Sequence, residues 1–233
     1  MAKVVSCLKH AWANRAGIKR YFVKIEIWSD IMCPFCYLGK GRLEQALAAF
    51  PGKAEVEITW KSFQLNPDMP NEPGITLEQY LVDRKGWSPD RIRAGHERIA
   101  RAGAELGLHY DFDRAVVANS LDAHRLIQAA KAEGKGDVME DRLFRAYFGE
   151  GKSIADHGVL AALAVDAGLD AEKARAVLAD PQAYAAEVQA DLREAAQLGV
   201  TGVPFFVFNR KFAVSGAQDS EVFAQALAQA ASG

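Results

Sequence analysis

The segment VKIEIWSDIMCPFC, residues 23–36, joins an apolar run to two cysteines three positions apart, Cys33 and Cys36. The apolar residues 23–28 predict a buried strand, and the polar pair that follows predicts a turn. A helix is expected over residues 33–50, since a proline suits its first turn and a Pro-Gly pair follows its end. Two thiols at the start of a helix can close a small, reactive disulfide.

The other β segments lie at both ends of the chain. Residues 55–60 alternate polar and apolar side chains and predict a second strand, so that strand, helix and strand form a right-handed parallel unit. Residues 204–208 are strongly β-forming, and Asn209-Arg210 predicts a tight turn into a strand over 211–214. A closing helix, capped by Asp219 or Ser220, completes the order βαβ…αββα.

The middle of the chain has a helical period from about Thr76 to Ala196. Residues 65–74 carry three prolines and predict an ordered loop before it. Asn119 is expected to cap a helix over 120–132, with Asp122 close to the N–H groups of the first turn. Further helices are expected to start at Thr76 and Ser88 and to cover 137–148, 155–167, 171–178 and 181–198.

This order of elements predicts an α/β protein with a helical insertion. Residues 23–74 and 181–233 are expected to form one domain, and residues 75–180 an inserted helical subdomain. Residues 1–22 form a basic extension in which no acid occurs. Two interpretations of this extension are left open: an organelle transit peptide, and an irregular extension or mis-assigned start. A secretory signal is not expected, because lysine interrupts its apolar stretch.

Composition narrows the class of protein. The chain of 233 residues has 28 Lys and Arg against 30 Asp and Glu, a net charge of −2, which favours neither nucleic acid nor an anionic membrane as a partner. No apolar run approaches the roughly 18 residues that a membrane span requires. With three cysteines in the whole chain, a reducing, cytoplasmic location is expected, where a CxxC pair is catalytic or metal-binding.

The spacing of Cys33 and Cys36 favours redox chemistry. The helix N-terminus is expected to stabilise the Cys33 thiolate and to lower the pKa of this thiol below the ordinary value of about 8.5. Cys36 is expected to be more buried and less acidic, so that Cys33 attacks a disulfide and Cys36 resolves the mixed disulfide. A zinc half-site and two inert core thiols are the alternatives. Only Cys7 remains as a further cysteine, and no second ligand pair is evident, so no metal is expected.

Several spaced motifs together resemble one family. They are IWSD at 27–30, CPFCYLG at 33–39, WKSFQLNP at 60–67, NS at 119–120, AHRL at 123–126, GVTGVPFFV at 199–207 and SGAQ at 215–218. In this order they resemble the DsbA family of the thioredoxin-fold superfamily, and especially its FrnE-like branch. The resemblance runs from about residue 23 to the C-terminus and includes the helical insertion.

The resemblance implies a thioredoxin-like fold and a thiol–disulfide oxidoreductase that exchanges its disulfide with protein or small thiols. It implies a cis bond before Pro204, in a loop packed against the cysteine pair, where the Val203 backbone would pair with a peptide or glutathione strand. Asn66, Val203 and Ser215 are candidate contacts for glutathione. Pro34 and Phe35 are candidate substrate contacts within the motif, although Phe35 can equally serve ordinary packing. No cofactor is implied beyond glutathione as a co-substrate, and a homodimer is left open.

Two other functions compete with this interpretation. Kappa-class glutathione transferases and 2-hydroxychromene-2-carboxylate isomerases share the fold and insertion but characteristically have serine where this chain has Cys33. A glutathione-dependent isomerase or transferase acting on a small aromatic compound is therefore one alternative. The other is a chaperone-like module that binds peptides without redox chemistry.

Outside the candidate site residues, we expect four further side chains to have mainly structural roles. His124 is expected to be a structural or surface histidine rather than an acid–base group. Asp30, as a turn residue, is expected to be solvated, with any role limited to proton relay. Trp28 and Trp60 are expected to be core aromatics near the site.

Overall fold

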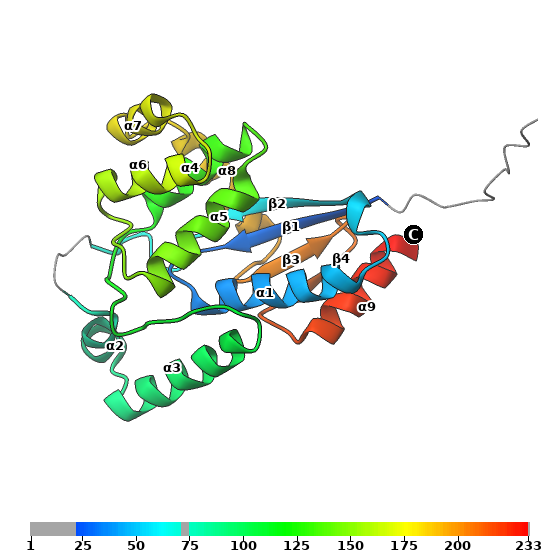
Figure 1. Ribbon diagram of the computed structural model, residues 1–233, viewed down its shortest axis with the longest axis horizontal. Coiled ribbons are helices and arrows are strands. Elements are labelled where there is room, and N and C mark those ends of the chain that lie inside the picture. The colour runs from blue at the N-terminus through cyan, green and yellow to red at the C-terminus, as the bar shows by residue number, and fades with distance from the viewer. Residues whose placement is uncertain (1–21, 71–74, 233) are drawn as a thin grey trace, which may run out of the picture.

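A computed structural model describes residues 22–70 and 75–232 of the chain (Figure 1). Its centre is a four-stranded sheet with the strand order β2-β1-β3-β4. β1 and β2 are parallel, whereas β3 is antiparallel to both β1 and β4. The strands are β1 (Val23–Ser29), β2 (Val56–Ser62), β3 (Phe205–Phe208) and β4 (Phe212–Ser215). The predicted α/β, thioredoxin-like class is confirmed.

The second strand is longer than its alternation predicts. It continues past Trp60 because Lys61 and Ser62 pair with Trp28 and Ser29 of β1. The strand therefore reaches the residues that lead into the cysteine motif.

The turn between β3 and β4 forms as predicted from its two residues. Asn209 and Arg210 have φ angles of 51° and 55°, the left-handed conformation that a two-residue hairpin of this twist requires. Asn209 also accepts a hydrogen bond from Lys24 N at 2.8 Å, which ties the turn to β1.

Two helices lie next to the sheet, α1 (Pro34–Ala49) and α9 (Ser220–Ser232). They pack against each other. α1 starts with proline at its first position, where the missing N–H costs no hydrogen bond. Gly39 lets α1 come close to the β3 region, because a Cβ there would lie 3.0 Å from Pro204 Cγ and 3.1 Å from Phe206 Cζ. This close approach sets the start of α1 beside the Pro204 loop.

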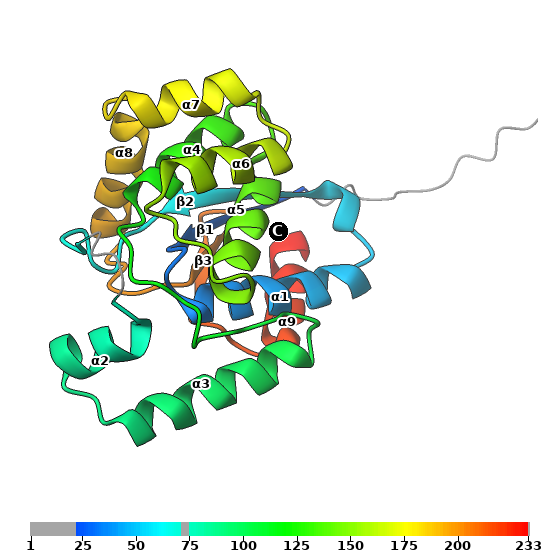
Figure 2. The same cartoon turned by 60° about the vertical axis from the view of Figure 1, so that its left-hand side comes forward.

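The remaining helices, apart from a short 3-10 helix before β2, lie between β2 and β3 in the chain. In Figure 2, α4, α6, α7 and α8 cover one side of the molecule and α2 and α3 lie at the other. Of these helices, α4, α5 and α8 contact β2. Their bounds are α2 (Leu77–Lys85), α3 (Pro89–Ala104), α4 (Leu121–Lys131), α5 (Gly136–Phe144), α6 (His157–Asp166), α7 (Ala171–Ala179) and α8 (Ala185–Gln197), with a short π-helix η2 (Arg145–Gly149) after α5 and a short 3-10 helix η1 (Lys53–Glu55) before β2.

The start of α4 differs from the prediction. Asn119 Oδ1 accepts the Leu121 N–H at 2.9 Å, but the residue at the N-cap position is Ser120. Asp122 does not bind the first-turn N–H groups as expected. Its carboxylate accepts hydrogen bonds from Arg125 at 2.9 Å and interacts with His157 at 2.7 Å. The charged guanidinium of Arg125 gives a stronger bond than a backbone amide does.

The start of α8 also differs from the prediction. The helix begins at residue 185 rather than 181, since Tyr184 takes a left-handed φ of 59° that interrupts a right-handed helix. The preceding residues form a turn in which Ala183 N donates to Asp180 O at 3.0 Å.

The core is continuous between the sheet and the helical region. One cluster of buried apolar side chains contains Ile25 and Ile27 of β1 as well as Leu126 of α4 and Leu143 of α5. Aromatic rings join the two parts, since Tyr37 of α1 stacks on Phe144 with ring centroids 5.1 Å apart. The division into a domain and an inserted subdomain stays a prediction.

Some predictions concern residues that the structure does not describe. Residues 1–21 of the basic extension, including Cys7, and the last four residues of the predicted 65–74 loop lie outside the described residues. Within residues 22–70 and 75–232, no helix has the length and apolar character needed to cross a bilayer.

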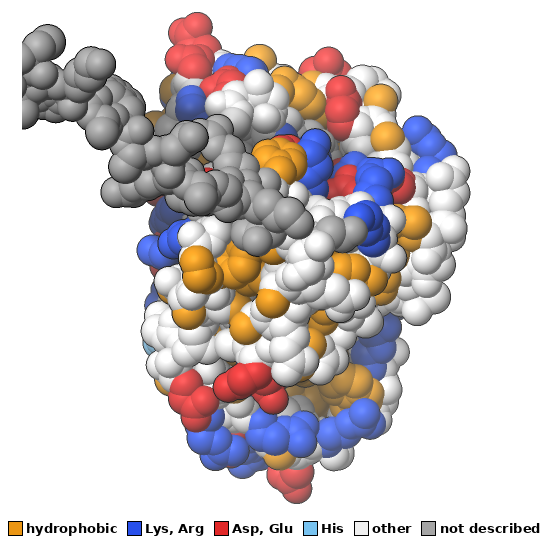
Figure 3. Space-filling view, turned by 90° about the vertical axis from the view of Figure 1, so that its right-hand side faces the viewer, with side chains coloured by type: hydrophobic (Ala, Val, Ile, Leu, Met, Phe, Trp, Pro, Cys, Tyr) orange, Lys and Arg blue, Asp and Glu red, His pale blue; other side chains and the backbone are white. Residues whose placement is uncertain are grey.

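Figure 3 shows the end of the molecule at which β1 begins, with hydrophobic side chains gathered near its centre and charged side chains above and below.

Candidate active site

The two cysteines lie where β1 passes into α1. Cys33 N donates to Asp30 O at 3.0 Å and closes a turn, and Cys33 takes the extended N-cap conformation ahead of the helix. Cys36 lies inside the first helical turn, with its N–H bonded to Cys33 O at 2.9 Å. Both residues are buried, and both are free thiols. The predicted pair therefore lies at the helix start.

The Pro204 loop faces Cys33. The Cys33 thiol donates to Val203 O at 3.5 Å, and the Val203–Pro204 peptide bond is cis, the isomer that the resemblance implies. A groove of about 370 Å³ follows this loop; residues 199–205, Ser215 and Gly216 line it. Three predicted contact residues, Val203, Pro204 and Ser215, thus line one groove, and Val203 is the residue of that groove that Cys33 contacts.

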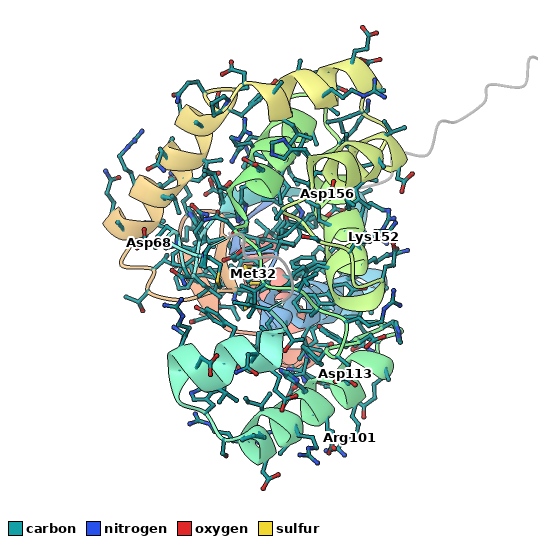
Figure 4. All side chains as sticks on the ribbon, turned by 90° about the vertical axis from the view of Figure 1, so that its left-hand side faces the viewer. Met32, Asp68, Arg101, Asp113, Lys152 and Asp156 are labelled. Atoms are coloured by element: carbon teal, nitrogen blue, oxygen red, sulfur yellow. The ribbon has the colours of Figure 1, made fainter. Side chains whose placement is uncertain are left out.

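The surface around the motif is partly apolar. The Phe35 side chain, inside the motif, is 49% exposed. Figure 4 views the molecule from the side opposite Figure 3 and shows Met32, the neighbour of Cys33, near the centre of the face. Asp68 and Lys152 lie to either side of it in that view. An exposed aromatic ring within the motif can contact an apolar segment of a peptide.

Asn66 is held by α2 rather than by the cysteine pair. Its amide nitrogen donates to the Tyr80 hydroxyl at 2.9 Å and lies 3.9 Å from the Met69 sulfur. The predicted role of Asn66 as a glutathione contact stays a prediction.

Tyr110 is a site residue that sequence reasoning missed. It lies in the loop after α3, and its hydroxyl donates to Pro34 O at 2.9 Å, inside the cysteine motif. Its ring fits against α3 because residue 103 is glycine; a Cβ there would overlap the ring. A glycine inside a helical pattern is the signal that could have indicated such a close contact.

Cys36 differs from Cys33 in its surroundings. Burial raises the pKa of the Cys36 thiol well above its ordinary value, and the neighbouring Cys33 raises this pKa further. The Asp30 backbone and the Ser29 hydroxyl have an opposite, smaller effect on this pKa. Cys36 is therefore predominantly a thiol at neutral pH.

The Ser29 side chain binds a buried carboxyl group, that of Glu140. The Ser29 hydroxyl donates to Glu140 Oε1 at 2.7 Å, and Glu140, on α5, is 1% exposed. Sequence reasoning missed Glu140. Its position one turn before Leu143 and Phe144 places it on the apolar face of its helix. An acid on such a face is the sequence signal that could have indicated a buried carboxyl group.

The expectation that Asp30 is solvated is wrong. Asp30 is 1% exposed, because the chain after β2 covers it: Leu65 N donates to Asp30 Oδ2 at 2.8 Å and Met32 N to Oδ1 at 3.2 Å. His124 of α4 is also buried, as a structural histidine would be. Its Nε2 lies 3.6 Å from Asp30 Oδ1 and has no hydrogen-bond partner among residues 22–70 and 75–232.

The buried carboxyl of Glu140 should make stability depend on pH. Burial raises the pKa of Glu140 from its ordinary value of 4.5 to about 7. A raised pKa means that the folded chain holds the proton more tightly. The resulting stability is fully present below about pH 4.5 and is lost as the pH rises through 7.

We therefore expect Glu140→Gln, which stays neutral, to gain stability relative to wild type as the pH rises. The difference in free energy of unfolding should shift in favour of the variant by about 2 to 3 kcal/mol between pH 5 and pH 8. Urea denaturation of both proteins at each pH measures it. A difference that stays constant over this range would show that Glu140 does not titrate there.

Metal ligands are not assembled at this site. Within residues 22–70 and 75–232 there is no group of three or more His, Cys, Asp or Glu side chains arranged to hold a metal ion.

Comparisons with known proteins agree with this geometry. The model of the DSBA-like thioredoxin domain family matches residues 24–228. The uncharacterized protein YwbO of Bacillus subtilis is 29% identical over 212 residues, which cover 88% of this chain and 96% of YwbO. A crystal structure of a probable DsbA oxidoreductase from Streptomyces coelicolor is 47% identical, with a TM-score of 0.85 over 89% of each chain. The cytosolic disulfide reductase DsbM from Pseudomonas aeruginosa, solved with GSH, shares the fold at 22% identity, with a TM-score of 0.59 over 89% of this chain and 96% of DsbM.

Proposed function

Because this chain belongs to the family of DSBA-like thioredoxin domains, we propose that it exchanges disulfides through Cys33 and Cys36. The observation that carries the proposal is the placement of the Cys33 thiol, at the helix N-terminus and 3.5 Å from the Val203 carbonyl oxygen of the groove. A substrate strand in this groove would bring its sulfur against Cys33. The second thiol lies one helical turn away, ready to resolve the product.

The reaction consists of two exchange steps. The Cys33 thiolate attacks one sulfur of a substrate disulfide, forms a mixed disulfide and displaces the other substrate sulfur as a thiolate. The Cys36 thiolate then attacks Cys33 Sγ, closes the Cys33–Cys36 disulfide and displaces the second substrate thiolate. The substrate gains two electrons and, from solvent, two protons, while the enzyme loses two electrons. The same steps in reverse oxidise a dithiol.

The groove supports a peptide-like substrate. The Val203 backbone, Pro204 and Ser215 would hold an extended strand, as in other cases where a peptide adds to a sheet edge. Pro34 and the exposed Phe35 would contact its apolar side chains. Glutathione, a short peptide thiol, would fit the same backbone contacts, and the DsbM structure contains GSH.

The wider setting of the protein is also part of the proposal. The scarcity of cysteines supports a cytoplasmic protein in which this pair is catalytic. The helical segment 75–180 would act as an inserted subdomain over a domain of residues 23–74 and 181–233, and two copies could pair as a homodimer.

The test is a redox titration combined with an insulin assay. Equilibration in glutathione buffers, acid quenching, alkylation and mass spectrometry should show one two-electron transition of the Cys33–Cys36 pair. The protein should also accelerate insulin reduction by dithiothreitol. If the pair shows no such transition, and insulin is reduced no faster than by dithiothreitol alone, the proposal is wrong.

A further inference from the structure

Two separate segments of the chain build the proposed substrate groove. Residues 199–205 form one part, and Ser215 and Gly216, at the end of β4, form the other. Gly216 N donates to Pro204 O at 2.8 Å and joins the two parts. The position of the second part therefore sets how a substrate strand can lie beside the Pro204 loop.

The second part of the groove continues into a loop, residues 216–219, that leads to α9. Two hydrogen bonds shape this loop: Gln218 N donates to Gly216 O at 2.9 Å, and Gln218 Nε2 donates to Ser215 O at 2.8 Å. Both bonds join residues at most three positions apart. They give the loop its form but do not attach it to a distant element, so other contacts must hold it in place.

Helix α1 supplies such contacts from its middle turns, where it packs beside α9 (Figure 1). Arg42 Nη1 donates to Ala217 O, and Arg42 Nη2 lies 3.0 Å from Asp219 Oδ1. Gln45, three residues further along α1, accepts a hydrogen bond from the Ser220 hydroxyl. Side chains three positions apart share one face of a helix. This face of α1 thus holds the loop and the start of α9.

Gly39 brings α1 close to both parts of the groove. A Cβ at this position would lie 3.0 Å from Pro204 Cγ and 3.5 Å from Ala217 Cα. Arg42 follows one helical turn later, and Cys33 precedes the first turn of the same helix. One helix therefore carries the attacking sulfur and also positions the groove that would receive its substrate.

We propose that Arg42 is a positioning residue that holds the substrate groove in its binding shape. Its bonds to Ala217 and Asp219 fix the Ser215–Gly216 part, against which an extended peptide would lie. This inference rests on the proposed disulfide exchange. Arg42 lies nine positions after Cys33, about 13 Å along the helix axis, so it acts through the loop and not on the sulfur. A groove that is already ordered binds a peptide more tightly, because less ordering remains to be done on binding.

Two disulfides that release the same coloured thiolate separate peptide binding from the reactivity of Cys33. One is dithiobis-nitrobenzoate, which has no peptide strand. The other joins thionitrobenzoate to the central cysteine of a short, uncharged peptide. Attack by reduced enzyme releases thionitrobenzoate from both, since its sulfur is the better leaving group.

Arg42→Met should weaken the binding of the peptide only. The peptide concentration that gives half the maximal rate of colour release should rise about fivefold or more, as expected for the loss of a charged hydrogen-bond donor. The maximal rate with the peptide, and the rate with dithiobis-nitrobenzoate, should equal those of wild type. Arg42→Lys keeps the charge and a donor, and should restore part of the affinity for the peptide.

Asp219→Ala is the second variant, and it serves if Arg42→Met does not fold. The Asp219 side chain is 73% exposed, so its removal should leave the fold intact and weaken peptide binding by a smaller factor. Arg175→Met is the matched control, since it makes the same change as Arg42→Met at an exposed position of α7, and it should behave as wild type.

A wild-type response to peptide concentration in Arg42→Met and Asp219→Ala, or equal slowing with both disulfides, would overturn the role of Arg42. The proposed function fails on a different observation. If mass spectrometry showed that wild type keeps the peptide on Cys33 and never releases it, Cys36 would not resolve the mixed disulfide. The role of Arg42 is judged from the first step alone.

Discussion

Cys33→Ser is expected to reduce insulin no faster than dithiothreitol alone, because a hydroxyl cannot form the mixed disulfide that starts the exchange. Cys36→Ser should behave differently. Its Cys33 still attacks the substrate, but nothing resolves the product, so the protein should accumulate as a stable mixed disulfide. Turnover is measured with insulin, and the trapped species by mass spectrometry of protein incubated with oxidised glutathione.

The two variants also separate the competing functions. Equal insulin turnover in wild type and Cys33→Ser would rule out disulfide exchange by this pair. Glutathione-dependent conversion of an aromatic substrate that survives Cys36→Ser would favour the isomerase or transferase. Suppression of aggregation that is unchanged in the double variant Cys33→Ser/Cys36→Ser would favour a chaperone-like module.

Arg125→Met should destabilise the folded protein by about 3 to 5 kcal/mol, the typical cost of breaking a buried charge network. Arg125 is 1% exposed. Its Nη1 donates to the carbonyl oxygens of Val177 and Asp180 at 2.6 Å each and of Ala183 at 3.2 Å. Its Nη2 donates to Asp122 at 2.9 Å. Methionine fills a similar volume but leaves these acceptors without their donor.

Urea denaturation followed by circular dichroism measures this effect. Arg175→Met is the matched control, since Arg175 is exposed on α7, and its free energy of unfolding should change by no more than about 0.5 kcal/mol. If Arg125→Met lost as little stability as this control, the bonds of Arg125 to the end of α7 would have no net structural importance.

The sheet, its main helices and the cysteine pair could be predicted because they follow from local rules. An apolar run, an alternating segment and a β-forming segment identified strands β1, β2 and β3, Asn209-Arg210 identified the hairpin, and the Pro34 position identified the start of α1. Helix ends were less predictable. α8 starts late because Tyr184 adopts a left-handed conformation, which no residue-type preference for tyrosine indicates.

The groups that surround the dithiol could not be predicted from spacing. Glu140 and Ser29 are 111 positions apart in the chain, and Tyr110 and Pro34 are 76 apart. Asp30 looked like a solvated turn residue until the loop after β2 was seen to cover it. Each of these contacts depends on how helices and loops pack, and a one-dimensional pattern does not encode packing between distant segments.

Residue types and their spacing were thus sufficient to predict the fold class and to locate the cysteine pair, since backbone preferences and periodic burial act over short distances. The electrostatic environment of those sulfurs was not accessible in this way. It arises where α1, α4 and α5 meet the end of β1, and the pKa of a buried group depends on every charge and dipole that packing brings within a few ångströms of it.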